Sequence, residues 1–135
     1  NLKKSIWIRL NRIPEFNFVF DSITEDIKKI SQDYILSQDE YRLLIYQVGD
    51  FFKWHVDYNP SVVRLSNFII YLNDHEACTE FLNGKKIKPE AGKIVFFPTT
   101  WVHAHRGQVV EKGAKYMLTS FIHYDSTGER YTPVK

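Results

Sequence analysis

The sequence contains one cysteine, Cys78, and one methionine among its 135 residues. A single cysteine excludes a disulfide framework within the chain and fits a reducing compartment. No apolar run is long enough for a membrane span, and there is no secretory segment. We therefore expect a cytoplasmic protein without a membrane partner.

The sequence also lacks an excess of either charge, because 18 basic residues face 16 acidic ones and the net charge is +2. This balance argues against nucleic acid or a strongly acidic partner. Aromatic residues, by contrast, make up 16% of the chain and are spread along it, which favours strands. The length suits one domain with a buried core. Nothing in the sequence indicates an oligomeric state.

The first 40 residues carry strand patterns and one helix pattern. Residues 5–10 predict a first strand, and residues 16–20 predict a short extended segment. A capping box at Ser22 and Glu25 begins an amphipathic helix that continues to about Leu36. We expect this helix to buttress a sheet.

From residue 41 onward the sequence consists of short β-prone runs separated by turn residues, with Asn83-Gly84 as a hairpin signal. The pattern predicts a mainly β fold with a buttressing helix (α+β), either a barrel or a double-sheet jelly roll. We expect a single domain over residues 1–135, with strand and helix in 1–40, a jelly-roll core in 41–124 and a polar tail in 125–135. The expected strands are residues 41–47, 51–57, 62–72, 79–82, 94–97, 101–110 and 114–123, and the last two should pair.

Two residues that can bind metal, His55 and Asp57, lie in the second of these strands. Side chains at i and i+2 of a strand point to the same side, so an imidazole and a carboxylate would aim at one point. They would form two thirds of the 2-His-1-carboxylate triad that holds non-haem Fe(II). A solvated strand face or a local histidine–carboxylate pair would explain the same two residues, so a third ligand is needed to decide.

Four further histidines are candidates for the third ligand. His103 and His105 lie two apart on one predicted strand, so either could complete the triad. His75 lies in a polar turn and is expected at the surface. His123 ends the last strand and is expected to be structural or exposed.

A lysine lies on the last predicted strand, where both faces are largely apolar. Lys115 shares one face with Met117, Thr119 and Phe121. An unpaired ammonium is costly to bury, so Lys115 needs a partner. It could extend to solvent, pair with a protein carboxylate, or meet the carboxylate of a bound ligand, and Thr119 could then add a hydroxyl.

Taken in order, these motifs resemble the core of the 2-oxoglutarate- and Fe(II)-dependent dioxygenases, specifically the prolyl 4-hydroxylase-like branch. The similarity runs from residue 41 to residue 124. It comprises Tyr46 and Gly49 followed by His55 and Asp57, residues 64–66 and 71–74 in a central strand, Thr79 and Phe81 after a turn, residues 92–98, and His105 with Gly113 and Lys115.

The resemblance implies a double-stranded β-helix fold and a set of site residues. In the family, the distal histidine precedes the basic residue by nine or ten positions, and His105 precedes Lys115 by ten. The resemblance therefore implies His105 as the third iron ligand and leaves His103 in the cleft. By the same comparison, Lys115 would bind the distal carboxylate of 2-oxoglutarate together with Tyr71 and Thr119, and Tyr46 would contact the other end of the cosubstrate. The residues expected to contact the substrate are Arg64, Trp101 and His103. A structural ion pair for Arg64 and core packing for Trp101 remain alternatives.

The implied activity is hydroxylation of an unactivated C–H bond, most typically in a peptidyl or protein proline. The reaction would consume O2 and 2-oxoglutarate and release succinate and CO2, with ascorbate as a candidate accessory. Alternatives are a free amino acid or nucleobase as a small-molecule substrate, a non-catalytic metal-binding jelly-roll module, and a cupin-like protein with another metal. Balanced charge counts against a nucleobase. The full ligand set counts against a non-catalytic module, and a cupin would leave Lys115 unexplained.

Two features depart from the family pattern. Glu76-Ala77-Cys78 replaces the Gly-Gly turn, so we expect that loop and its contacts to differ. The stretch between Asp57 and His105 is short and leaves little room for a substrate lid. Cys78 would lie near the iron, although packing is the commoner role for a lone cysteine.

Overall fold

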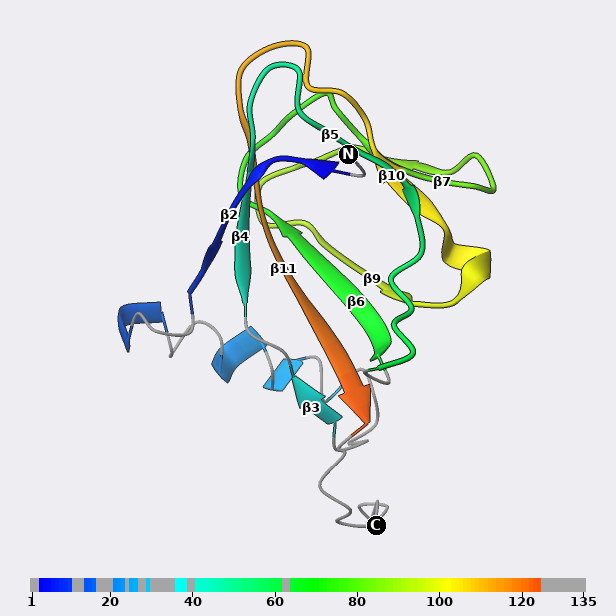
Figure 1. Ribbon diagram of the computed structural model, residues 1–135. Coiled ribbons are helices and arrows are strands. Elements are labelled where there is room, and N and C mark those ends of the chain that lie inside the picture. Colours follow the sequence, from blue (N-terminus) through cyan, green and yellow to red (C-terminus); the bar gives the residue numbers. More distant parts are fainter. Residues whose placement is uncertain are drawn as a thin grey trace.

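The chain folds into two antiparallel sheets that face each other (Figure 1). This computed structural model describes residues 3–10, 14–16, 21–23, 25–26, 29, 36–38, 41–61 and 64–124. The larger sheet has the order β2-β4-β11-β6-β9, and β3 also pairs with β11. Its strands are β2 (Ile6–Arg9), β3 (Leu36–Gln38), β4 (Arg42–Tyr46), β6 (Arg64–Tyr71), β9 (Ile94–Pro98) and β11 (Lys115–Tyr124).

The smaller sheet has the order β1-β5-β10-β7-β8. Its strands are β1 (Lys3–Lys4), β5 (Phe51–His55), β7 (Thr79–Phe81), β8 (Lys86–Ile87) and β10 (His105–Gly107). Two short 3₁₀ helices, η1 (Pro14–Phe16) and η2 (Trp101–His103), lie in connections. This arrangement confirms the predicted double-stranded β-helix. Among the described residues, no helix is long and apolar enough to cross a membrane.

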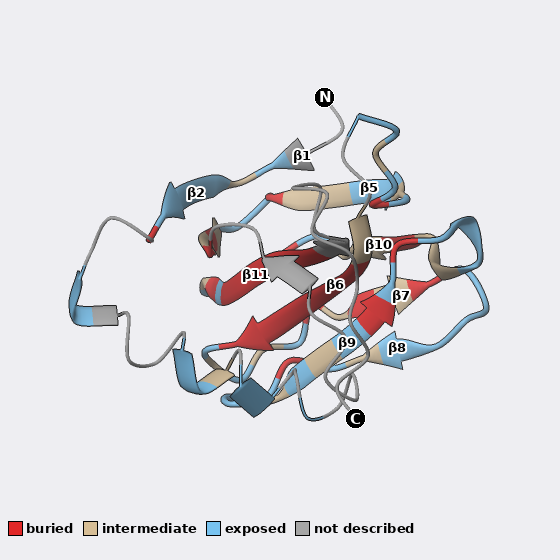
Figure 2. Cartoon of the chain, turned by 90° about the horizontal axis from the view of Figure 1, so that it is seen from below, coloured by how far each residue is buried: buried red, intermediate tan, exposed pale blue. Residues whose placement is uncertain are grey.

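The two central strands of the larger sheet are buried on both faces. Figure 2 shows β6 and β11 as the most continuously buried strands, whereas β2 at the edge is exposed. The inward face of the sheet packs against the smaller sheet, and the outward face is covered where Leu10 and Tyr41 pack. The inward core contains Leu44, Tyr46, Ile69, Tyr71, Phe81, Phe97 and Met117, and the outward core contains Phe68, Ile70, Leu118 and Ile122.

Register in the larger sheet places the polar residues of β11 on the cavity side. Lys115 lies opposite Tyr46 of β4, and Thr119 lies opposite Arg42. Because side chains alternate along a strand, all four project from the same face of the sheet. The predicted shared face of Lys115, Met117, Thr119 and Phe121 is confirmed, since all four line one cavity.

The strand expected over residues 114–123 is confirmed as β11, but its expected pairing with residues 101–110 was wrong. Residues 101–103 form η2, and β10 pairs with β5 and β7 in the smaller sheet, whereas β11 lies in the larger one. The chain crosses between the sheets at the fully buried Val110, whose amide donates to the carbonyl of Asp50. In a jelly roll, a turn between two β-prone runs connects different layers as readily as it closes a hairpin.

Smaller differences concern element ends. The first strand is divided into β1 and β2, the strand expected to reach Asp57 ends at His55, and Pro98 still belongs to β9. The expected helix is supported at residues 21–23, 25–26 and 29, but Leu36 begins β3. Phe16 belongs to η1, while residues 17–20, 30–35 and 125–135 lie outside the described residues. The hairpin at Asn83-Gly84 is confirmed, with β7 paired to β8 and Gly84 at φ +88°.

Candidate active site

Three potential metal ligands converge between the sheets. His55 and His105 face each other as register partners on β5 and β10, and Asp57 follows two residues after β5 ends. The Nε2 atom of His55 lies 3.5 Å from Oδ1 of Asp57, and Nε2 of His105 lies 3.5 Å from Oδ2. One ligand atom from each residue falls within 4.8 Å of the others. Strand pairing therefore supplies both imidazoles, and the strand end supplies the carboxylate.

The chain itself fixes the tautomer of each histidine. Nδ1 of His55 lies 2.7 Å from the carbonyl oxygen of Lys53, and Nδ1 of His105 lies 3.0 Å from that of His103. A carbonyl only accepts, so each Nδ1 carries a proton, and the neutral form of each ring therefore has its lone pair at Nε2. Nε2 of His55 is buried without a hydrogen-bond partner. An unsatisfied buried nitrogen of this kind fits a metal ligand.

The carboxylate of Asp57 is held by a second buried chain of hydrogen bonds. The amide of Asn67 donates to Oδ2 of Asp57 at 2.8 Å, and the hydroxyl of Thr119 lies 2.9 Å from Oδ1 of Asn67. Burial alone would raise the pKa of Asp57, but the two imidazoles and the Asn67 amide hold that pKa below its ordinary value. The carboxylate is therefore ionised and oriented.

Burial lowers the pKa of His105, and the neighbouring His55 lowers it further. The ring of His105 is 5% exposed and packs against Phe81 and Phe97 from the two sheets. It therefore stays neutral to lower pH than an exposed histidine, which keeps its lone pair available to a metal.

A cavity of about 500 Å³ connects the triad to Lys115. The lysine is 1% exposed, so the alternative in which it extends to solvent is wrong. Its Nζ donates to the carbonyl of Ala77 at 3.2 Å and lies 4.8 Å from the ring centre of Tyr46. No carboxylate pairs with it among the described residues. Burial lowers the pKa of Lys115 to about 8, and an anionic ligand would supply the missing partner.

The remaining predicted site residues divide into two groups. Tyr46, Thr119 and Arg64 line the cavity, and Arg64 also stacks on Phe121 at 3.8 Å from the ring centre. Tyr71 is fully buried, and its hydroxyl donates to Oγ1 of Thr79, which lines the cavity.

Two residues predicted to contact substrate lie outside the cavity lining. Trp101 is 77% exposed on η2, and the Nδ1 atom of His103 is bonded to the hydroxyl of Thr100. The 3₁₀ turn is the reason, because it removes the strand alternation that would have aligned His103 with His105. His103 takes part through its carbonyl, which orients the ring of His105.

Comparison with known proteins identifies the architecture. The profile of the 2OG-Fe(II) oxygenase superfamily matches residues 41–123. The chain belongs to this superfamily. A search of the curated proteins found no matching sequence relative.

Solved structures show where this oxygenase stands by fold. The viral collagen prolyl hydroxylase from Paramecium Bursaria Chlorella virus-1, in its 2OG complex, has a TM-score of 0.76 at 20% identity, covering 91% of this chain and 79% of that chain. A Pseudomonas putida prolyl-4-hydroxylase has a TM-score of 0.69 at 17% identity, covering 93% and 75%. A Trichoplax adhaerens prolyl hydroxylase, in complex with a hypoxia inducible factor peptide fragment, has a TM-score of 0.68 at 17% identity, covering 90% and 62%. At these identities, the likeness establishes the shared fold.

The residues of this oxygenase fit the groups that its superfamily uses. Two imidazole Nε2 atoms and an ionised carboxylate converge on one point, which suits a divalent cation. A buried ammonium without a carboxylate partner among the described residues lies in the same cavity, which suits the far carboxylate of 2-oxoglutarate. Both requirements are met by side chains whose orientation is already fixed.

Sequence reasoning missed three residues of this site. Asn67 carries an amide on the inward face of an apolar strand, a signal that could have been noticed, since a buried amide needs partners. His75 was expected at the surface and is half-buried, and its two hydrogen bonds were not expected: it accepts from the amide of Ala77 at 2.9 Å and contacts the carbonyl of Lys112 at 2.9 Å. It thereby joins the two loops beside Lys115. Arg42 of β4 lines the cavity and gave no sequence signal.

Proposed function

We propose that this oxygenase hydroxylates an unactivated C–H bond of a peptidyl or protein proline. The observation that carries the proposal is the convergence of two Nε2 lone pairs and one carboxylate in a cavity that also holds a buried lysine. Three prolyl hydroxylases of the same fold support the substrate class. When bound, Fe(II) and 2-oxoglutarate supply the oxidising chemistry, with O2 consumed and succinate and CO2 released.

The proposed role of each residue follows from its position. His55, Asp57 and His105 would hold Fe(II) through atoms already oriented by neighbouring carbonyls and by Asn67. Lys115 would bind the distal carboxylate of 2-oxoglutarate. Enclosure between two sheets limits water at this site.

Two more residues would complete the cosubstrate end of the cavity. The ring of Tyr46 forms its wall beside Lys115. Tyr71 would act through Thr79, to which its hydroxyl is bonded. Burial raises the pKa of Tyr71 to about 12, so this hydroxyl remains a donor throughout the working pH range.

The test is an anaerobic titration with Fe(II) and then 2-oxoglutarate, followed by visible absorption. A weak metal-to-ligand charge-transfer band should form and should disappear when oxygen is admitted. The band should persist in His103→Ala and be lost in His105→Ala. Lys115→Ala should weaken the binding of 2-oxoglutarate and leave metal binding unchanged. A band that survives in His105→Ala and is lost in His103→Ala would transfer the ligand role to His103.

The substrate class needs a separate assay. Proline-containing peptides should gain one oxygen atom by mass spectrometry, together with succinate in equal amount. Ascorbate should increase the number of turnovers without changing the affinity for the peptide. A charge-transfer band without oxidation of any proline peptide would retain the oxygenase chemistry and exclude the proposed substrate.

A further inference from the structure

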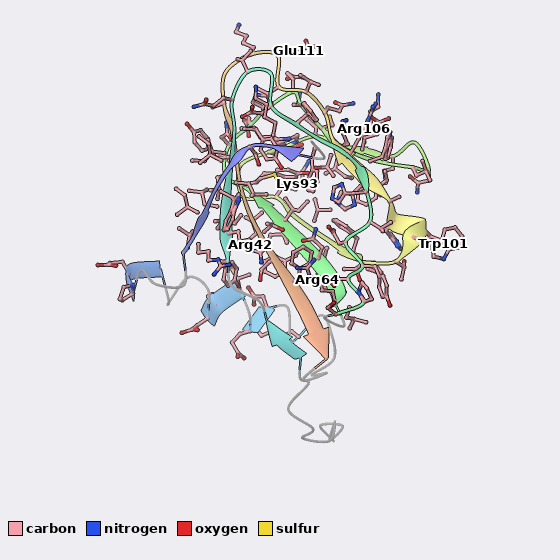
Figure 3. The ribbon with its side chains drawn as sticks, in the orientation of Figure 1. Arg42, Arg64, Lys93, Trp101, Arg106 and Glu111 are labelled. Carbon is pink, nitrogen blue, oxygen red and sulfur yellow. The ribbon has the colours of Figure 1, made fainter. Side chains whose placement is uncertain are left out.

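Arg42, for which no polar side-chain partner is found among the described residues, faces the cavity from the larger sheet. Arg42 lies on the inward face of β4, opposite Thr119, and lines the same cavity as the triad. Its Nε atom is buried and has no hydrogen-bond partner. Among the described residues, no carboxylate forms an ion pair with it. Figure 3 shows Arg42 and Arg64 at the lower end of the barrel, on the strands that flank β11.

The cavity lining around Arg42 contains more positively charged than negatively charged side chains. Asp57 is the one carboxylate among the described residues of the lining. In the proposed function, the two charges of Fe(II) are matched by Asp57 and the near carboxylate of 2-oxoglutarate, and Lys115 is matched by the far carboxylate. The guanidinium of Arg42 then has no counter-ion among the described residues of the lining, to which Arg64, stacked on Phe121, adds a further positive charge. A partly buried guanidinium is strongly favoured by a carboxylate partner, which it can bind with two parallel hydrogen bonds.

The position of Arg42 separates it from the cosubstrate end. Lys115 lies opposite Tyr46, and Arg42 is four residues from Tyr46 along β4. Four residues of a strand span about 13 Å. Thr119, the register partner of Arg42, donates a hydrogen bond to Asn67 of β6, and Asn67 donates to the carboxylate of Asp57. A group bound at Arg42 would therefore lie at the level of the triad, away from Lys115.

We propose that Arg42 forms a carboxylate subsite for the primary substrate, so that this enzyme selects a substrate with an acidic group close to the oxidised carbon. The inference rests on the proposed function and narrows its substrate class. The carboxylate could be that of a C-terminal proline, or that of an acidic residue beside a proline in a peptide. Both sources offer the same planar anion to the guanidinium.

A structural role for Arg42 is the competing explanation. Its guanidinium lies 6.0 Å from the ring centre of Trp7, and the guanidinium of Arg9 lies 5.7 Å from the same ring. Arg9 is exposed and is not part of the cavity lining. Arg9→Gln is therefore a matched control, because it alters the same aromatic contact without touching the cavity.

The experiment measures direct binding of paired probes by calorimetry to the full chain, with and without Mn(II) and 2-oxoglutarate. One pair is N-acetylproline and its amide, N-acetylprolinamide. The other is acetyl-Gly-Pro-Glu-amide and acetyl-Gly-Pro-Gln-amide. In the wild-type protein, the acidic member of one pair should bind about 10-fold more tightly than the neutral member. The pair that shows the preference identifies the source of the carboxylate.

The variants separate the subsite from a structural role. Arg42→Gln should abolish the acidic preference, Arg42→Lys should restore part of it, and Arg9→Gln should leave it intact. Affinity for 2-oxoglutarate should change less than about 2-fold in all three. Equal binding of both members of each pair by the wild type, or an unchanged preference in Arg42→Gln, would overturn the subsite. Loss of 2-oxoglutarate binding in Arg42→Gln would also overturn it, by assigning Arg42 to the cosubstrate.

Failure of the subsite and failure of the proposed function give different results. The charge-transfer band of wild-type protein does not depend on the probes, and probe binding does not require turnover. A normal band without acidic preference would overturn only the subsite. An acidic preference without a band would retain the subsite and reject the oxygenase chemistry.

Discussion

At the scale of single residues, Asn67 is the link between the larger sheet and the carboxylate of the triad. It donates to Asp57 and is bonded to Thr119, so its amide has little freedom. We expect Asn67→Ala to weaken Fe(II) or Mn(II) binding by about 10- to 100-fold, because Asp57 loses its orienting donor. Metal titration monitored by calorimetry measures this. Thr119→Val should show a smaller loss and Thr119→Ser almost none. Undiminished affinity in Asn67→Ala would contradict the assigned role.

We expect Lys115 to lower the stability of the ligand-free protein while providing the charge that binds 2-oxoglutarate. Burial lowers the folded-state pKa of Lys115 to about 8, below its ordinary value of 10.5. A lysine with a depressed pKa destabilises the fold below that pKa, and the penalty is relieved as pH rises from about 8 to 10.5. Lys115→Met should therefore raise the melting temperature of the ligand-free protein at pH 7 by several degrees while abolishing 2-oxoglutarate binding.

The pH profile provides the check on Lys115. In the wild type, affinity for 2-oxoglutarate should fall as pH rises through about 8, because the neutral amine no longer pairs with a carboxylate. The stability difference between wild type and Lys115→Met should narrow over the same range. A 2-oxoglutarate affinity that is flat from pH 7 to about 9.5 would contradict the first expectation, and a constant stability difference over that range would contradict the second.

Residue types and strand alternation predicted the pair His55 and Asp57 and drew attention to the buried Lys115. They left His103 and His105 as alternatives for the third ligand, and the choice of His105 came from the family resemblance. Arg42 could not be found this way, because an arginine on an alternating strand normally faces solvent. Its role depends on which face of β4 is enclosed, and that is decided by the second sheet.

At the scale of elements, an irregularity in β5 shapes the cavity wall. His105 pairs with His55, but Gly107 pairs with Phe52, so β5 has one more residue than β10 over this interval. Residues three apart on a regular strand would face opposite sides, whereas the bulge turns Phe52 and His55 to the same side. Their rings stack with centres 3.6 Å apart. This irregularity was not predicted from the sequence, because a bulge leaves no distinctive residue pattern here.

The same bulge places Gly107 beside Phe52 and Lys115, so a side chain at position 107 would restrict the cosubstrate end of the cavity. A Cβ at this position would lie 3.4 Å from Cβ of Phe52 and 4.0 Å from Nζ of Lys115. Gly107→Ala should weaken the binding of 2-oxoglutarate several-fold. Gly107→Val should weaken it about 10-fold or more, because the added methyl groups occupy space beside the Lys115 ammonium. Metal affinity should be unchanged in both, as measured on the same samples. If Gly107→Val binds 2-oxoglutarate as the wild type does, the cosubstrate lies elsewhere.

Strand positions were predictable to within a few residues, but their assignment to sheets was not. Alternation and turn residues locate each run, as for β6 and β9. They do not say which layer a run joins, so β10 and β11 were paired wrongly. That choice is made by long-range contacts such as the burial of Val110 at the crossing.

At the scale of the whole molecule, metal binding should stabilise the fold. The three ligands come from β5, the segment after it and β10, and Asn67 connects them to the larger sheet. A metal that binds only the folded state at 100 times its Kd adds about 2.7 kcal/mol. This should raise the melting temperature by roughly 8 °C for a chain of this size. Differential scanning fluorimetry with Mn(II) under anaerobic conditions measures the shift.

The variants for this measurement follow from the site. His103→Ala should keep the full shift, because its side chain is bonded to Thr100 and its carbonyl is retained. Asp57→Asn should lose most of it. A shift of equal size in Asp57→Asn would indicate that the metal stabilises the protein at another site.

The hydrogen bonds that orient the two histidines determine which neighbouring residues can change without altering the site. Each imidazole is held by the carbonyl two residues before it in its own chain segment. Any amino acid supplies that carbonyl, so Lys53 and His103 can be exchanged freely as far as the ring orientation is concerned. The orientation of the two rings therefore requires only the histidines themselves and the backbone path that carries them, whereas the orientation of Asp57 also requires the side chain of Asn67.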